Sequence, residues 1–282
     1  MQNTYTIKTM NQQEVELAVE WAAQEGWNPG LHDAQCYYAA DPNGFLIGYL
    51  KDEPIATISA VKYSDDFGFI GFYIVKPEYR VKGFGIQIWN AALEYLKGAN
   101  VALDGVVAQQ ENYKKSGFKL AYSNIRYEGL GGGNTLEDAS IVKLASLPFD
   151  TIEAYDQPFF PASRPNFLKA WITQPDSHAL GIMSNGVLSG YGVIRECREG
   201  YKIGPLLADS PELAESLFLA LKSKLNTSDT VYLDTPEVNQ AAVNLAERHG
   251  MKVSFETARM YTAETPNIPL NRLFGVTSFE IG

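Results

Sequence analysis

The chain has 282 residues, of which 45% are hydrophobic and 20% are charged, and its formal net charge at pH 7 is −10. The hydrophobic fraction is that of an ordinary globular protein, so composition excludes a wholly disordered chain. The acidic balance argues against nucleic acid or an anionic membrane as a partner, because phosphate-binding surfaces are usually basic. It suits an amine-bearing partner and also plain solubility.

The sequence predicts neither a targeting segment nor a metal centre. Residues 1–10 lack the apolar region of a signal peptide, and no run approaches the roughly 18 apolar residues of a membrane span. Cys36, Cys197 and the three histidines show no metal-ligand spacing. We therefore expect a cytoplasmic protein without a metal.

The first half of the chain mixes strand and helix patterns. Asn11 and Glu14 have the spacing of a capping box, which opens a helix that ends at Gly26. A second helix is predicted around Trp89, from apolar residues at helical spacing, and a short third helix ends at Gly117. Strands are predicted at Thr4–Lys8, Phe45–Leu50, Pro54–Tyr63, Phe67–Val75, Val101–Val107 and Phe118–Tyr127.

The second half repeats the first. When Gly117 is aligned with Gly250, Arg126 faces Arg259, and the segment 101–104 resembles 231–234. Pairs of a capping residue and proline at 210–211 and 235–236 predict two helix starts. Two copies of one α+β unit explain the length. We predict an N-terminal domain at 1–130, a glycine-rich linker at 131–145 and a C-terminal domain at 146–282.

The segment from Val75 to Gly85 carries the clearest chemical signal. It joins an apolar strand to an amphipathic helix and places Gly83 and Gly85 at the helix start. Such a turn exposes free N–H groups at the positive end of the helix dipole, and glycine lets an anion approach the backbone. Since Arg80 and Lys82 add positive charge to an acidic chain, we predict a local anion site.

This segment resembles the pyrophosphate loop of the GNAT superfamily of acetyl-CoA-dependent N-acetyltransferases. The family pattern Gln/Arg-x-x-Gly-x-Gly/Ala reads Arg80-x-x-Gly83-x-Gly85 here. A Val-x-Pro-x-Tyr-Arg lead-in and a Tyr-x-x-x-Gly-Phe run at 113–118 extend the resemblance, which covers Thr4–Tyr127. The two halves and the segment 274–282 are similar to bacterial GNAT proteins with a second, diverged GNAT-like domain. This implies an α+β fold of two tandem domains, each a mostly antiparallel sheet flanked by helices.

The resemblance also implies roles for individual residues. Loop N–H groups would hold the CoA pyrophosphate, and the preceding strand would separate from its neighbour, pair with the pantetheine arm and polarise the thioester carbonyl. Tyr113 would protonate the departing thiolate as general acid. The cofactor-binding residues implied are Tyr73, Ile74, Val75, Arg80, Val81, Lys82, Gly83, Phe84, Gly85, Ile86, Gln109 and Asn112.

The general base is not evident. Some GNAT proteins carry a glutamate on the strand before the loop, but the matching residues, Phe69–Ile74, include no carboxylate. A water chain or a side chain from elsewhere would serve, or no base is needed if the amine arrives deprotonated.

The second half retains the fold signals and lacks the cofactor signals. Neither alignment of its first helix matches the two loop glycines with glycine, and Ala246 takes the place of Tyr113. We therefore expect this half to bind no acetyl-CoA and to wall the substrate cleft, with Arg164 and Tyr261 as positions to test.

The acceptor pocket is predicted at the loop 26–33. Trp27 offers an aromatic face to an apolar body or a cation, or packs in the core. Asp33 offers a carboxylate to an ammonium group or acts as base, or caps the following turn. Asn28 lies beside Trp27 in the same loop.

The prediction is an N-acetyltransferase that moves the acetyl group of acetyl-CoA to a primary amine of a small molecule, by direct attack in a ternary complex. We expect a monomer or homodimer without nucleic-acid or membrane partners. The alternative is a non-catalytic acyl-CoA-binding sensor or interaction module.

Overall fold

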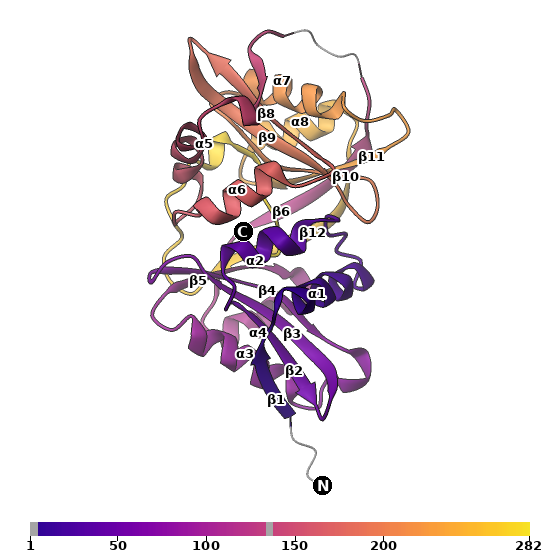
Figure 1. The fold of residues 1–282 in the computed structure, drawn as a ribbon, viewed down its shortest axis with the longest axis vertical. Helices are drawn as coiled ribbons and strands as arrows, with labels where there is room; N and C mark the ends of the chain where they lie inside the picture. The colour runs from indigo at the N-terminus through magenta and orange to yellow at the C-terminus, as the bar shows by residue number, and fades with distance from the viewer. Residues whose placement is uncertain (1–4, 134–137) are drawn as a thin grey trace.

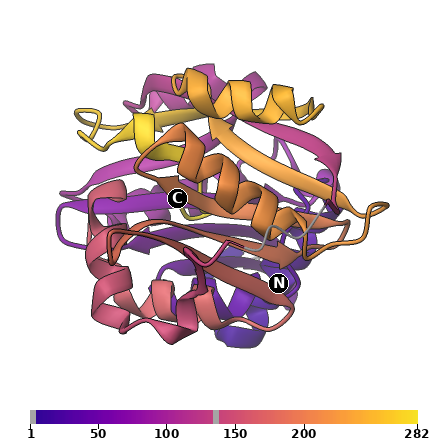
Figure 2. The same cartoon turned by 90° about the horizontal axis from the view of Figure 1, so that it is seen from above.

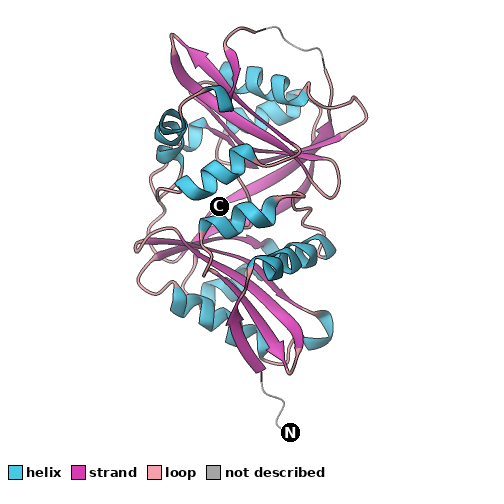
Figure 3. Cartoon of the chain, in the orientation of Figure 1, coloured by secondary structure: helices cyan, strands magenta, loops and turns pink. Residues whose placement is uncertain are grey.

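The structure is a computed structural model that describes residues 5–133 and 138–282. In these residues thirteen strands form one continuous sheet that runs through both halves (Figure 1 and Figure 3). The strand order is β1-β2-β3-β4-β5-β12-β6-β11-β10-β9-β8-β7, and β13 pairs with β10. Within the described residues, only β4 with β5 and β10 with β11 run parallel. The predicted α+β class with a mostly antiparallel sheet is confirmed.

The first half provides the elements around the candidate site. Helix α1 (Gln12–Gln24) begins at the predicted capping box: the Asn11 side chain accepts from the Glu14 N–H at 3.0 Å, and the Glu14 carboxylate accepts from the Asn11 N–H at 2.8 Å. Thr4, in the first predicted strand, lies outside the described residues. The other elements are β1 (Tyr5–Thr9), α2 (Asp33–Ala40), β2 (Phe45–Leu50), β3 (Glu53–Lys62), β4 (Phe67–Val75), α3 (Phe84–Tyr95), β5 (Asn100–Val106), α4 (Gln110–Lys115) and β6 (Lys119–Leu130).

The second half repeats this order with its own elements. They are β7 (Ile141–Lys143), α5 (Phe149–Asp156), α6 (Pro165–Thr173), β8 (Ser177–Ser184), β9 (Val187–Glu196), β10 (Tyr201–Ala208), α7 (Pro211–Lys222), β11 (Thr230–Pro236), α8 (Gln240–Arg248), β12 (Lys252–Tyr261) and β13 (Leu273–Gly275).

The two halves exchange their last long strands. β6, from the first half, pairs with β11 and β12, whereas β12, from the second half, pairs with β5 and β6. Each half of the sheet is therefore completed by a strand of the other. The domain division at 131–145 stays a prediction. β7 lies inside that range, and residues 134–137 of it are outside the described residues.

Two matching buried ion pairs secure the exchanged strands. Arg126 on β6 donates from Nε and Nη2 to the two carboxylate oxygens of Asp234 on β11, at 2.7 and 2.8 Å. Arg259 on β12 donates from the same two nitrogens to the carboxylate oxygens of Asp104 on β5, at 2.9 and 2.6 Å. Bidentate geometry of this kind gives strong, directional charge-assisted hydrogen bonds. The repeated arginine and aspartate therefore act across the halves.

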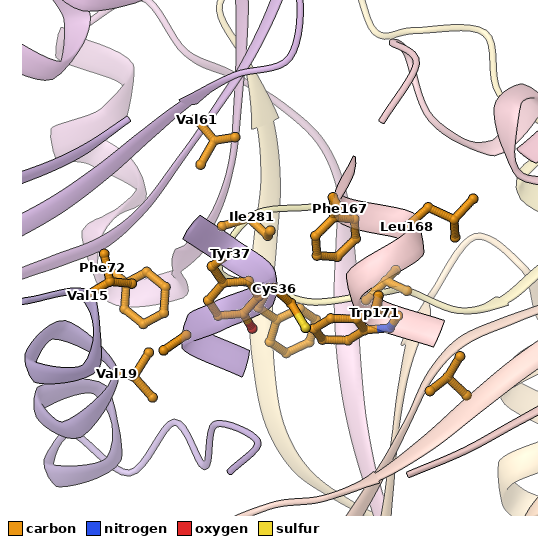
Figure 4. Packing of buried hydrophobic residues seen from close by; sticks show 14 of the residues in the cluster. Val15, Val19, Cys36, Tyr37, Val61, Phe72, Phe167, Leu168, Trp171 and Ile281 are labelled. Atoms are coloured by element: carbon orange, nitrogen blue, oxygen red, sulfur yellow. The ribbon is translucent and has the colours of Figure 1, made fainter. Parts of the chain in front are cut away.

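Helices cover both faces of the sheet. In the second half, α5 and α6 lie on one side of the strands and α7 and α8 on the other (Figure 2). In the first half, α1 and α2 face the same core as α5 and α6, whereas α3 packs on the opposite face. This shared core joins the halves where α2 meets α6: the Tyr37 and Trp171 rings stack at 6.0 Å (Figure 4).

Some local predictions were wrong. Helices α2, α5 and α6 lie where the patterns predict none. A helix start is confirmed at Ser210, whose side chain caps α7, but not at Thr235. Strand β11 continues through Pro236, and α8 begins after Asn239, whose side chain accepts from the N–H groups of residues 241 and 242. Pairing of β11 with β6 outweighs the local capping signal.

Candidate active site

One cavity of about 1010 Å³ brings together most of the predicted site residues. Its volume is at the upper end of the roughly 300–1,000 Å³ typical of ligand sites. Of the predicted residues, it is lined by Trp27, Tyr73, Ile74, Val75, Arg80, Val81, Gly83, Gly85, Ile86, Gln109, Asn112 and Tyr113. Lys82, Phe84, Asn28 and Asp33 are not part of this lining.

The cavity opens where β4 parts from β5. The two strands pair in parallel from Phe67 with Asn100 to Ile70 with Leu103, and no further pair follows in these described strands. At the parting point Phe72 adopts a left-handed φ of +49°, an uncommon conformation for a bulky residue. The Thr57 hydroxyl donates to its carbonyl at 2.9 Å and holds this bulge. The open edge of β4 therefore faces the cavity.

The glycine loop forms an uncapped helix start beside this opening. Gly83 is the N-cap of α3 with φ +82°, and Val81 also has a positive φ, +54°. Successive N–H groups in such a turn converge into an anion-binding nest, and the helix dipole adds to it. Within this described helix, neither a side-chain cap nor an acidic residue occupies the first turn. The arrangement suits a phosphate.

Glycine is needed in this loop for two different reasons. At Gly83 a Cβ would meet no atom within 4 Å, so the requirement is the left-handed backbone. At Gly85 a Cβ would lie 2.6 Å from the Tyr73 Oη, so the requirement is space. Gly83 therefore shapes the anion-binding turn, and Gly85 leaves room for the Tyr73 ring of β4.

Arg80 is held at the cavity by two contacts. Its Nε donates to the Val75 carbonyl at 2.8 Å, and its guanidinium pairs with Glu25 at 2.5 Å. Lys82 instead lies over the Tyr79 ring, with its Nζ 5.6 Å from the ring centroid. Arg80 is thus the predicted loop cation that reaches the cavity.

Tyr113 lies on α4 across from β4 and is mostly buried. Its ring stacks on Trp89 with centroids 5.7 Å apart, and a Cβ on Gly105 would overlap it. Burial, with a smaller contribution from Tyr73, raises the pKa of Tyr113 to about 12. The phenol therefore keeps its proton at neutral pH. Gln109 and Asn112, joined by a 2.7 Å hydrogen bond, line the cavity nearby.

The matching opening in the second half is filled by the chain itself. β10 and β11 pair only from Tyr201 to Ile203, and β13 then pairs with β10 at Leu206 and Leu207. The Val276 N–H donates to the Asp234 carbonyl of β11 at 2.8 Å, which closes the other side. The segment 273–276 thus occupies in this half the place that is open in the first.

The far end of the cavity is built from both halves. Phe255 and Thr257 of β12 line it with Phe279 and Glu280. Arg126 lines it too, with its guanidinium 4.9 Å from the Phe279 ring centroid. The sequence patterns did not identify these residues, because strand exchange and the course of the final segment bring them here. Arg164 and Tyr261, the predicted test positions, are buried and not part of the lining.

Asp33 and Asn28 have partners inside the protein. Asp33 is fully buried, and its carboxylate accepts from Arg195 at 2.8 and 3.1 Å and from the Gly30 N–H at 2.8 Å. Asn28 bonds through its side chain to the main chain of Glu199. Neither is placed to meet an acceptor, so the structure corrects that expectation. Trp27 is the member of the trio that lines the cavity.

Two further properties of the described residues bear on the class of protein. No cluster of three or more potential metal ligands occurs among them. None of their helices is long and apolar enough to cross a bilayer.

Comparison with known proteins gives matches in both halves. The model of the acetyltransferase (GNAT) family matches residues 12–118, and that of an acetyltransferase (GNAT) domain matches residues 152–275. Holothin acyltransferase from a Pseudoalteromonas species is 30% identical over 279 residues, which cover 99% of this chain and 95% of that protein.

Solved structures show the same fold. An acetyltransferase candidate from Pyrococcus horikoshii aligns over 100% of this chain and 97% of its own, with a TM-score of 0.83 and 24% identity. A tandem GNAT protein from the clavulanic acid biosynthesis pathway aligns over 93% of this chain and 100% of its own, with a TM-score of 0.63 and 12% identity.

The fold and the cavity thus define a tandem GNAT protein, a class that generally uses acyl-CoA donors. The chain belongs to the GNAT acetyltransferase family, and it is an acyltransferase.

Proposed function

We propose that this acyltransferase moves an acetyl group from acetyl-CoA to a primary amine of a small molecule. The observation that carries the proposal is the single lining shared by the anion-binding start of α3, the open edge of β4 and the phenol of Tyr113. The relative holothin acyltransferase is named for one particular compound, which supports a specific small-molecule acceptor for this protein too.

The residues present fit acetyl-CoA. The uncapped turn at Val81 and Gly83 would hold the pyrophosphate, with the guanidinium of Arg80, paired with Glu25, next to it in the sequence. The gap between β4 and β5 leaves strand N–H and carbonyl groups free for an extended amide-containing arm. Acetyl-CoA, when bound, supplies an activated thioester carbonyl.

The chain would then contribute positioning, hydrogen bonds and one proton. N–H groups of β4 near Tyr73 donate to the carbonyl oxygen, which stabilises the negative charge that develops there. Tyr113 holds a proton at its Oη for the departing sulfur. Trp27, Phe255 and Phe279 would exclude water and pack against an apolar acceptor body.

The test is release of free CoA from acetyl-CoA across a panel of small amines, repeated with longer acyl-CoA donors. We expect one group of amines to release CoA well above the rate of donor hydrolysis, with acetyl-CoA as a good donor. Binding of CoA without release on any amine would contradict the proposal and favour the sensor alternative, against which family membership argues.

The cytoplasmic location, the monomeric or homodimeric state and the lack of nucleic-acid and membrane partners stay predictions. The oligomeric state is accessible to light scattering coupled to size-exclusion chromatography.

A further inference from the structure

The final segment of the chain brings a carboxylate into the cavity. Glu280 lines it while being only 3% exposed. Its main chain lies directly on β4, since a Cβ on Gly71 would overlap the Glu280 carbonyl oxygen. The neighbouring Ile281 is fully buried in the core between the halves (Figure 4), and its carbonyl accepts from the Tyr63 hydroxyl at 2.8 Å. The main chain of Glu280 is therefore held by its contact with β4 and by the buried residue that follows it.

The two carboxylate oxygens of Glu280 have different surroundings. Oε2 accepts from the Ser278 hydroxyl at 2.5 Å and from the Tyr37 hydroxyl at 3.2 Å. Oε1 has no hydrogen-bond partner in the described part of the chain. Oε1 is not among the fully buried atoms that lack a partner, so it stays accessible from the cavity that Glu280 lines, where a donor from a ligand can reach it.

Glu280 also differs from the other carboxylates in this region. Asp33, Asp104 and Asp234 each pair with a guanidinium within 3 Å. Among residues 5–133 and 138–282, Glu280 forms no such ion pair.

The cations that face Glu280 already have other partners. Arg126 on β6 is bound by Asp234, and Lys202 on β10 donates to the Asn28 carbonyl at 3.0 Å. Both feel the charge of Glu280 without contacting it. On α2, Asp33 reaches it only through the Tyr37 hydroxyl, at 3.1 Å from that oxygen. The free position at Glu280 therefore suits a cation from outside.

Resting on the proposed function, we infer that Glu280 binds the amine nitrogen of the acceptor and takes its proton. β4 carries no carboxylate at 69–74, but the main chain of Glu280 lies against Gly71, where the strands part, and Glu280 lines the cavity there. An ammonium acceptor would give one proton to Oε1 and become nucleophilic. The nitrogen–acyl bond forms, the carbon–sulfur bond breaks, the second proton leaves the nitrogen to solvent, and the Tyr113 proton goes to sulfur.

The test compares Glu280→Gln with wild type and with Glu264→Gln, an exposed carboxylate outside the cavity. With an alkylamine that is protonated at neutral pH, we expect Glu280→Gln to lower kcat/KM for the acceptor by about 10²–10⁴-fold, the range for lost acid–base catalysis. The KM for acetyl-CoA should stay within twofold. With an arylamine that is already neutral, the loss should be much smaller. Glu264→Gln should match wild type.

Each outcome decides the inference. Equal activity of Glu280→Gln and wild type on the alkylamine would overturn it, as would equal losses on the two amines. If Glu280→Gln does not fold, Glu280→Asp keeps the charge but shortens the side chain. Glu280→Asp should then lower kcat without changing the affinity for acetyl-CoA, and a kcat equal to that of wild type would overturn the role of Glu280 as proton acceptor. Failure of the proposed function is distinct, because wild type itself would then release no CoA.

Discussion

Replacing Asp234 by Asn tests how far the exchanged strands join the two halves. Asp234 is 1% exposed and binds Arg126 across the β6–β11 boundary. The substitution keeps the shape of the side chain but removes its negative charge and replaces one of its two acceptor oxygens with an NH2 group. The buried guanidinium then keeps at most one amide oxygen and the Trp27 carbonyl, at 2.9 Å, as acceptors. Removing one partner of a buried pair typically costs about 3–5 kcal/mol. That is a large part of the roughly 5–15 kcal/mol that keeps a protein folded.

The effect should depend on pH. Burial raises the pKa of Asp234, but the Arg126 guanidinium outweighs burial and holds that pKa below its usual range. The charged carboxylate therefore stabilises the fold above the unfolded pKa of about 3.9, and this stabilisation is lost as the pH falls through the lower folded pKa. We expect the difference in unfolding free energy between wild type and Asp234→Asn to be full at pH 7 and to shrink below about pH 4.

The assay is hydrogen exchange read by mass spectrometry along a urea titration. It follows peptides of β3 in the first half and β9 in the second. Both should shift to lower urea by the same free energy, because β6 and β12 tie the halves into one sheet. Asp65→Asn, which breaks the exposed pair of Asp65 with Lys62, is the control and should change stability by less than about 1 kcal/mol. A shift confined to β9, or a loss no larger than that of the control, would refute this reasoning.

Three other predictions concern the cavity. Tyr113→Phe should lower kcat by about 10²-fold or more with little change in acetyl-CoA affinity, because a proton donor is lost while the stacking on Trp89 remains. Steady-state kinetics test this, and an unchanged kcat would rule out the role of Tyr113 as general acid. Gly83→Glu should abolish CoA binding in calorimetry through bulk and charge. Gly83→Ala, which adds only the left-handed strain of about 1–2 kcal/mol, should weaken binding far less, and equal losses would count against an anion site. Calorimetry should also give one CoA per chain, because β13 fills the second opening, whereas two per chain would contradict that assignment.

The loop and its helix could be predicted because their signals are local. The glycine turn and the helix start follow each other directly in the sequence, so their spacing predicts them. The separation of β4 from its neighbour was implied by the resemblance, and the bulge at Phe72 was not predicted. The position of Tyr113 followed from the same kind of pattern, carried by a resemblance to the family. These parts of the sequence therefore led directly to one end of the cavity.

The partners of β6 and β12 could not be predicted in the same way. Alternating apolar residues specify a strand and its buried face, but they do not specify which neighbour the strand joins. The alignment of Arg126 with Arg259 was visible in the sequence. The structure shows that each binds the aspartate of the opposite half, a pairing that no spacing encodes.

Asp33 and Glu280 show the same limit at the acceptor end. Asp33 was predicted at the end of the acceptor loop and looked available, but it begins α2, and Arg195, far along the chain, neutralises it. Glu280 gave no signal, since its chemistry depends on where the final segment crosses β4. Prediction failed for both because long-range contacts decide whether a carboxylate is free.

Strand exchange also limits how this enzyme can be divided. A fragment ending after β6 would carry the whole glycine loop and Tyr113, yet β5 would have a bare edge and β6 would have no partner. Unpaired edges of this kind bind other chains and aggregate. We therefore expect that the first half, which carries the glycine loop and Tyr113, does not fold as an independent domain. A gene split at the connection would yield active protein only where both pieces are made together and reassemble, each lending the other its closing strand.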